Sequence, residues 1–177
     1  MDGVISLIKP PGITSHDAIG ICRRILKERR IGHSGTLDPL AYGVLPIFVG
    51  KATRAIEYTE SIGKTYVAEC KFGIETDTED STGNVLRTMD ISKAPSWDEL
   101  EQAVQSFQGS IEQRPSKYSA IKINGQRAYD LARAGVEFEL PVRLIHIYDI
   151  ELLAYAFPFF TIRVRCSAGT YVRALLR

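Results

Sequence analysis

One short segment gathers the residues whose types and spacing could do chemistry. Residues 32–40 read Gly-His-Ser-Gly-Thr-Leu-Asp-Pro-Leu, and glycines on both sides of Asp38 let the backbone approach a ligand closely. Residues 1–54 carry eight Lys or Arg and four Asp or Glu, and nearby cations keep a carboxylate ionised. Asp38 is therefore a candidate nucleophile or base. On these residues alone the alternative is a plain turn, in which Asp38-Pro39 makes an Asx contact.

Other chemistries find little support in the sequence. It contains no phosphate-binding glycine loop, no dinucleotide fingerprint and no zinc-protease or serine-hydrolase motif. The three histidines lie far apart, and the three widely spaced cysteines predict neither a disulfide framework nor a zinc site. The cysteine usage, the lack of a secretory signal and the lack of an apolar run of about 18 residues together predict a cytoplasmic protein.

The charge distribution carries more information than its total. The 177 residues sum to a net charge of +1, which alone argues against nucleic-acid binding. By blocks, however, residues 1–54, 110–135 and 161–177 carry net charges of +4, +3 and +4. Residues 55–109 and 136–160 carry −7 and −3. Such segregation can build one basic face on a nearly neutral protein, although chance clustering is the alternative.

The elements around Asp38 must position it. Residues 4–8 form an apolar run that Lys9-Pro10-Pro11-Gly12 closes, which predicts a strand and a turn. A helix follows, with Ser15 as the expected N-cap residue and Asp17 in its first turn. Residues 31–43 are rich in glycine and read as a loop. A strand over 44–49 and a short helix over 52–60 come next.

The rest of the chain predicts more strands than helices. Residues 65–72 alternate, with Tyr66, Ala68, Cys70 and Phe72 on one face. Residues 75–84 are acidic and turn-like. A capping box at Ser96 begins a helix, whose expected buried residues are Leu100, Ala103, Val104 and Phe107. A short helix over 127–134, strands near 142–155 and 159–166, and a helix with Thr170 as its N-cap candidate complete the pattern, which favours an α+β fold.

Five segments in order resemble the TruB-type tRNA pseudouridine synthases. The central one runs from Gly32 through Asp38 to Thr53. The other four are Lys9-Pro10-Pro11-Gly12-Ile13-Thr14-Ser15-His16-Asp17, Lys64-Thr65-Tyr66, Pro115-Ser116-Lys117-Tyr118-Ser119-Ala120 and Gly169-Thr170-Tyr171-Val172-Arg173. The resemblance covers essentially the whole chain. It implies the pseudouridine synthase fold, a mixed and mostly antiparallel sheet flanked by helices.

The resemblance implies a reaction and the residues that carry it. Such enzymes flip a uridine out of the T-loop of tRNA, break its N1–C1′ bond, rotate the base and join C5 to C1′, without metal or cofactor. Asp38 aligns with the essential aspartate, Arg173 with the arginine that pairs with it, and Tyr66 with the tyrosine that stacks on the flipped base. Tyr171 aligns with a second pocket tyrosine, and His33 with a histidine that contacts the T-loop.

The resemblance also shapes what is expected of the rest of the molecule. Residues 1–177 would be one catalytic domain, with an insertion near 109–135 that closes over RNA. Members of the family continue past this point and usually add a PUA domain, so the catalytic domain is expected to be incomplete at its C-terminus. The expected partner is the T-arm stem-loop of tRNA, with no membrane and no obligate protein partner. Charge and position suggest phosphate contacts at Lys9, Lys51, Arg54, Lys117, Lys122 and Arg127.

Several residue assignments have simpler alternatives. Tyr66 could be a core residue, His33 a loop histidine bonded to backbone, and Arg173 a surface arginine. Two other functions share the fold: a non-catalytic RNA-binding or tRNA-folding module, and a guide-RNA-dependent relative. The trio of Asp38, Tyr66 and Arg173 argues against the first, and the stretch over 40–46 looks more like the stand-alone bacterial type.

Overall fold

The chain divides into two compact units, Met1–Ile62 and Gly63–Arg177. A computed structural model describes residues 1–59 and 63–176. Each unit has its own sheet and its own buried cluster of apolar side chains. None of the described helices is long and apolar enough to cross a membrane. The single catalytic domain expected over 1–177 stays a prediction.

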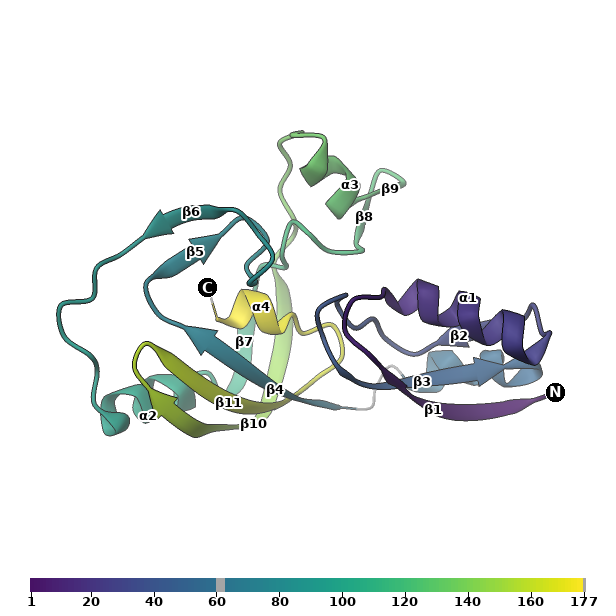
Figure 1. Cartoon of the computed structure of the whole chain (residues 1–177), viewed down its shortest axis with the longest axis horizontal. Coiled ribbons are helices and arrows are strands. Elements are labelled where there is room, and N and C mark those ends of the chain that lie inside the picture. The colour runs from purple at the N-terminus through teal and green to yellow at the C-terminus, as the bar shows by residue number, and fades with distance from the viewer. Residues whose placement is uncertain (60–62, 177) are drawn as a thin grey trace. The chain divides into compact units, whose positions relative to one another are not determined.

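The first unit is a three-stranded antiparallel sheet with a helix packed on it (Figure 1). Its strands follow the order β1 (Gly3–Lys9), β3 (Gly43–Val49) and β2 (Ile31–His33). Helix α1 (Ser15–Leu26) buries Ala18 and Ile19 against the sheet residues Leu45 and Ile47. A 3₁₀ helix, η1 (Gly50–Thr59), follows β3 where the sequence predicts a helix over 52–60. Glu60 lies outside the described residues.

Helix α1 begins one residue earlier than expected. Thr14 is its N-cap, because the Thr14 hydroxyl accepts the Asp17 N–H and the Asp17 carboxylate accepts the Thr14 N–H. The prediction of Ser15 as the cap is therefore wrong. Ser15 is the first residue of the helix, and its buried hydroxyl is bonded to a different segment of the chain.

The second unit is built on a four-stranded antiparallel sheet. Its order is β4 (Lys64–Lys71), β11 (Phe159–Cys166), β10 (Arg143–Ala156) and β7 (Gly109–Gln113). Helices α2 (Trp97–Gln105) and α4 (Val172–Leu175) add Leu100, Val104 and Leu175 to the core of this sheet. The predicted alternation holds, because Tyr66 and Ala68 also pack against this core.

Helix α2 buries a narrower stripe than predicted. The Ser96 capping box is present, and Leu100 and Val104 are buried one turn apart. Ala103 and Phe107 are exposed, so their predicted burial is wrong. Phe107 lies beyond the end of the helix at Gln105, where the helical periodicity no longer fixes which way a side chain faces.

Two small hairpins complete the second unit. Strands β5 (Ile74–Thr76) and β6 (Val85–Thr88) flank the acidic turn over 77–84. Strands β8 (Lys122–Ile123) and β9 (Gln126–Arg127) lead into α3 (Ala128–Arg133), near the predicted helix over 127–134. All strand pairings of the described residues are antiparallel, and separate helices and sheets confirm the α+β class.

Candidate functional site

The loop that carries Asp38 is tied to the segment between β1 and α1. The Ser15 hydroxyl accepts the Leu37 N–H and donates to the Leu37 carbonyl, both at 3.0 Å. On the other side of Asp38, the Pro39 carbonyl accepts the Gly12 N–H at 2.8 Å. The residues before and after Asp38 are thus each bonded to a segment more than twenty residues earlier in the chain. This arrangement fixes the backbone position of the half-buried Asp38.

Asp38 also begins a backbone turn, because its carbonyl accepts the Ala41 N–H at 3.0 Å. A turn at Asp38-Pro39 was the simpler alternative from the sequence, and proline is favoured at the second position of such a turn. The backbone carbonyl of Asp38 makes this turn. A turn and a reactive carboxylate are therefore compatible at this residue.

Lys9 is a positioning residue inside this loop. Its side chain is fully buried, and its ammonium group donates to the carbonyls of Pro10, Ile13 and Pro39 at 2.8, 2.8 and 3.2 Å. Burial lowers the pKa of Lys9, and the negative charge of Asp38 opposes that shift. The predicted phosphate contact at Lys9 is wrong, because an ammonium group that is buried against three carbonyls is not presented to RNA.

His33 is the last residue of β2, paired with Ile47 of β3. Its Nδ1 forms a close hydrogen-bonding contact with the Gly35 carbonyl. The contact fits the simpler alternative of a histidine bonded to backbone. It also fixes the plane of the half-buried ring, so a role in contacting a T-loop stays a prediction.

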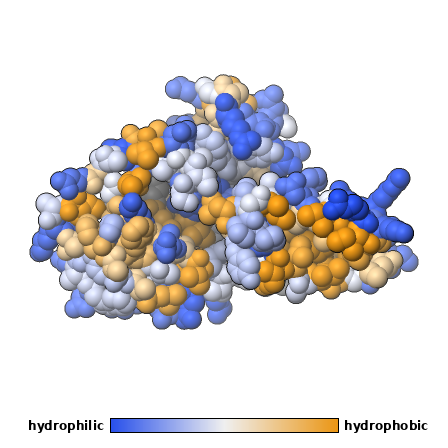
Figure 2. Space-filling view, in the orientation of Figure 1, coloured by the Kyte–Doolittle hydropathy of each residue, from blue (hydrophilic) through white to orange (hydrophobic). Residues whose placement is uncertain are grey.

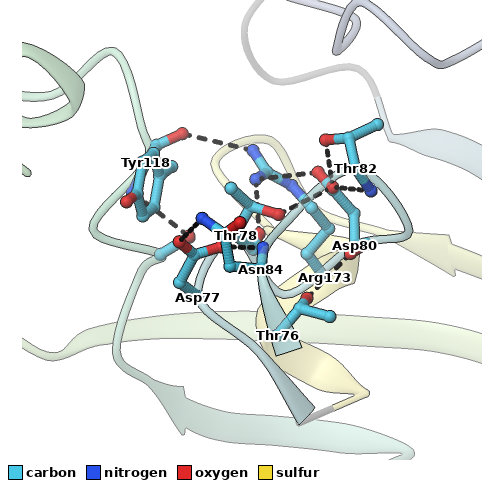
Figure 3. Close-up of polar contacts among 9 residues, drawn as sticks. Thr76, Asp77, Thr78, Asp80, Thr82, Asn84, Tyr118 and Arg173 are labelled. Carbon is cyan, nitrogen blue, oxygen red and sulfur yellow. Dashed lines mark hydrogen bonds and ion pairs between the residues drawn. The ribbon is translucent and has the colours of Figure 1, made fainter. Parts of the chain in front are cut away.

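In the second unit, Arg173 of α4 joins three segments (Figure 3). Its Nη1 donates to the Thr78 carbonyl at 2.9 Å and lies 3.4 Å from Asp80 Oδ2. Its Nη2 donates to the Tyr118 carbonyl at 3.3 Å. The Arg173 side chain is only 15% exposed, so it is not the surface arginine of the simpler alternative. Its expected pairing with Asp38 of the first unit stays a prediction.

Asp80 is a partner of Arg173 that the sequence did not reveal. Its Oδ1 accepts the hydroxyls of Thr78 and Thr82 at 2.8 and 2.6 Å and the Thr82 N–H at 2.9 Å, whereas Oδ2 faces Arg173. Burial alone would raise the pKa of Asp80. The hydrogen bonds from Thr82 and Thr78 and the positive charge of Arg173 outweigh burial and hold that pKa below its usual value. Asp80 is therefore an ionised partner of Arg173.

The two tyrosines of the predicted site are both half-buried in the second unit. Tyr66 lies on β4 opposite Val164 of β11, and it packs against the core as the simpler alternative proposes. Tyr171 is the N-cap residue of α4, one position after the expected Thr170. The amide side chain of the buried Gln113, a second residue that the sequence did not reveal, is bonded to the Tyr171 backbone.

The remaining predicted phosphate contacts are exposed. Lys51 and Arg54 lie on η1 in the first unit, and Lys117, Lys122 and Arg127 lie in the second. Figure 2 shows hydrophilic surface over the segment of β8, β9 and α3, which carries Lys122 and Arg127. Among the described residues, no group of three His, Cys, Asp or Glu side chains is placed to hold a metal ion.

Comparison with known proteins agrees with the resemblance read from the sequence. Residues 23–172 match the model of the TruB family pseudouridylate synthase (N terminal domain). The chain is 47% identical to tRNA pseudouridine synthase B of Clostridium acetobutylicum over 175 residues, which cover 99% of this chain and 60% of that protein. The corresponding protein of Geobacillus thermodenitrificans is 46% identical over 181 residues, again 99% of this chain and 60% of the relative.

Solved structures share the fold. The structure titled a Cbf5-Nop10-Gar1 complex contains a chain that is 33% identical, with a TM-score of 0.71, over 98% of this chain and 42% of that one. A structure of an H/ACA RNP bound to a substrate RNA gives 30% identity and a TM-score of 0.69, over 98% of this chain and 40% of that one. The chain spans about 60% of the length of the curated relatives it matches.

Proposed function

Because this chain belongs to the TruB family of pseudouridylate synthases, we propose that it isomerises a uridine in the T-loop of tRNA to pseudouridine. The uridine flips out of the loop, since an atom inside a base stack is out of reach of an enzyme group. The N1–C1′ bond breaks, the base rotates, and C5 bonds to C1′. The C5 proton leaves and N1 regains a proton, so atoms and electrons balance without a cofactor.

The observation that carries this proposal is the fixed backbone on both sides of Asp38. Ser15 holds Leu37, while Gly12 and Lys9 hold Pro39. A reacting group gains most from being held in place before the substrate arrives. Three separate residues hold the backbone beside Asp38, which favours a reacting group at this position. Asp38 thus acts on the flipped nucleoside, either at the base or at the ribose.

The other site residues have proposed roles around Asp38. Arg173 pairs with the Asp38 carboxylate and keeps it ionised and oriented. Bonding to Asp80 does not prevent this pairing, because a guanidinium presents five N–H donors in a fork. Tyr66 stacks on the flipped uracil and assists removal of the C5 proton. Tyr171 completes the pocket wall.

The proposed substrate is the T-arm stem-loop. His33 stacks in the rearranged loop in place of the extruded base, as aromatic side chains do in recognition of single-stranded RNA. The exposed cations contact phosphates. Those proposed are Lys51, Arg54, Lys117, Lys122 and Arg127. Of the predicted insertion over 109–135, residues 109–113 form β7 of the sheet, and the part that follows β7 closes over the bound RNA.

The test is the variant Asp38→Asn, assayed by tritium release from a T-arm stem-loop labelled at C5 of uridine. We expect the rate to fall by at least about 10³-fold, as it does when an enzyme loses its nucleophile, while the affinity for the stem-loop changes little. The matched control is Asp149→Asn, which removes an exposed carboxylate on β10 and leaves turnover unchanged. Substantial turnover by Asp38→Asn would refute the role of Asp38.

The same assay separates the alternatives. A non-catalytic RNA-binding module would bind the stem-loop without releasing tritium, even as the unmodified protein. A guide-RNA-dependent enzyme would release tritium only when a guide RNA was added. The unmodified protein alone is expected to turn over the stem-loop.

A further inference from the structure

The amide side chain of Gln113 forms two hydrogen bonds to the backbone of Tyr171. Gln113 Oε1 accepts the Tyr171 N–H at 2.9 Å, and Gln113 Nε2 donates to the Tyr171 carbonyl at 3.0 Å. Gln113 is 5% exposed, so these bonds form away from water. A side-chain amide offers such a donor and acceptor pair in one plane at any pH at which the protein is folded. The residue type therefore matches the backbone group that it holds.

Gln113, which makes this contact, belongs to the four-stranded sheet of the second unit. Gln113 is the last residue of β7, where it pairs with Arg143 of β10. The backbone of Gln113 is therefore fixed by the strand ladder. Tyr171, by contrast, follows a turn in which the Thr170 hydroxyl donates to the Ser167 carbonyl at 2.9 Å. The contact thus ties a turn to a rigid strand.

Helix α4 depends on this contact for its starting point. It spans only Val172–Leu175, and one helical turn is not stable by itself. Tyr171 is its N-cap residue and has no side-chain cap. The Tyr171 carbonyl also accepts the Leu175 N–H at 3.2 Å, which makes it the first acceptor of the helix. Gln113 therefore fixes the residue from which α4 starts.

The segment that begins at Gln113 also reaches Arg173. Five residues after Gln113, the Tyr118 carbonyl accepts Arg173 Nη2 at 3.3 Å. Residues 113–118 thus touch residues 171–173 at two points, one at the backbone of Tyr171 and one at the tip of Arg173. Loss of the first contact would shift both the Tyr171 ring and the base of the Arg173 side chain.

We propose that Gln113 is a positioning residue for the isomerisation, which it serves by holding Tyr171 and Arg173 in their working orientation. This inference rests on the proposed function. Gln113 acts through the two residues and does not itself touch the substrate. Its removal therefore affects the chemical step more than the binding of RNA.

The kinetic test uses Gln113→Ala and Gln113→Glu. For Gln113→Ala we expect kcat on the T-arm stem-loop to fall at least 10-fold, with KM changed less than 3-fold. The Gln113→Glu carboxylate accepts from Tyr171 but cannot donate to its carbonyl until it is protonated. Its kcat relative to the unmodified protein should therefore rise as the pH is lowered from 8 to 5.5. An unchanged kcat, or a loss confined to KM, would overturn the proposal.

The matched control is Gln108→Ala. Gln108 also donates to a backbone carbonyl, that of Tyr148 at 3.4 Å, but it does so at the exposed surface. Its kcat should stay within 2-fold of that of the unmodified protein. An equal loss in both glutamine variants would show a general effect of losing an amide.

A second readout does not depend on turnover. In the full-length protein, hydrogen exchange of the Tyr171 amide should be at least 10-fold faster in Gln113→Ala, and unchanged exchange would overturn the proposal. Gln113→Glu keeps the acceptor for the Tyr171 N–H, so it should leave this exchange nearly unchanged, and it serves for the kinetic test if the alanine variant does not fold. If the unmodified protein did not isomerise the T-arm uridine, the proposed function would be refuted. The exchange measurement would still test whether Gln113 holds the backbone of Tyr171.

Discussion

At the residue scale, Lys9 shows that a cation in a recognised motif need not meet the nucleic acid. Its charge lies inside the first unit, against the carbonyl oxygens of Pro10, Ile13 and Pro39. Burial disfavours the ammonium ion and lowers the pKa of Lys9, while Asp38 favours the charged form. Lys9 therefore stabilises the turn over residues 10–13. Gly12 of that turn binds the carbonyl of Pro39, the residue next to Asp38.

Lys9→Met should destabilise the protein. Methionine fills a similar volume but removes the donor that Lys9 supplies to the carbonyls of Pro10, Ile13 and Pro39, which is expected to lower the free energy of unfolding by about 1–3 kcal/mol. Urea denaturation measures the change. The control is Lys51→Met on the exposed surface, expected within about 0.5 kcal/mol of the unmodified protein. Equal stability of the two variants would contradict the structural role of Lys9.

The sequence indicated some residues of the proposed site but not their partners Asp80 and Gln113, for a physical reason. Asp38, Tyr66 and Arg173 stand in motifs whose residue types are chemically distinctive. Asp80 lies in an acidic turn, where carboxylates are common and usually solvated. Gln113 ends an ordinary strand, and glutamine is more often exposed than buried. Neither residue can be distinguished until the fold brings its partner close.

At the element scale, the turn between β5 and β6 orders itself around its own carboxylates. Asp77 accepts the Asn84 backbone N–H at 2.8 Å, and Asp80 accepts three bonds from Thr78 and Thr82. One oxygen of Asp80 thus serves the turn and the other faces Arg173 (Figure 3). The turn and helix α4 are thereby joined through one carboxylate.

Asp80→Asn should change how stability depends on pH. The pKa of Asp80 is lowered in the folded protein, so its carboxylate contributes stability above its ordinary pKa, and this contribution is lost as pH falls through the lowered pKa. The variant should therefore be less stable than the unmodified protein at pH 7, with a smaller difference at pH 3. Chemical denaturation at both values measures it. Asp149→Asn, on the exposed face of β10, should show no such convergence, and a constant difference for Asp80→Asn would rule out this linkage.

The elements themselves were largely predictable. Alternation placed the strands over 65–72 and 159–166 within a residue of β4 and β11, because period 2 records directly which face is buried. The Ser96 capping box marked the start of α2. The errors occur at short strands and at helix ends: residues 31–33, read as part of a loop, form β2, and β7 was not predicted. Thr14 and Ser15 are chemically similar cap candidates, and only their hydrogen-bond partners distinguish them.

At the scale of the whole molecule, the net charge of +1 conceals basic segments that belong to the proposed RNA contacts. The basic blocks over 1–54, 110–135 and 161–177 contain Asp38, the cations from Lys117 to Arg127, and Arg173. The acidic block over 55–109 contains Asp80, which is bonded inside the second unit. The charges of Asp80 and Arg173 offset each other within the fold, so neither is fully available to attract or repel RNA. The total charge of the chain is therefore a poor guide to RNA binding.

The affinity for tRNA should fall steeply with salt. Five exposed cations that each release a counterion predict a loss of about 10²-fold between 50 and 200 mM salt. Lys122→Gln should reduce the slope of log affinity against log salt by about one. Lys93→Gln, an exposed lysine in the acidic block, is the matched control and should leave the slope unchanged. A flat salt response would refute the basic face.

The sequence alone indicated the family and the longer elements, because five motifs and the periodicity of the side chains can be read directly from it. It also located Asp38 between glycines in a basic segment. Only the tertiary structure decided the contacts that hold the site: Lys9 and Ser15 on the Asp38 loop, Asp80 on Arg173, and Gln113 on Tyr171. Periodicity reports which face a side chain takes but not what it meets there. Each of these bonds joins residues at least 22 positions apart, so its partner exists only once the chain has folded.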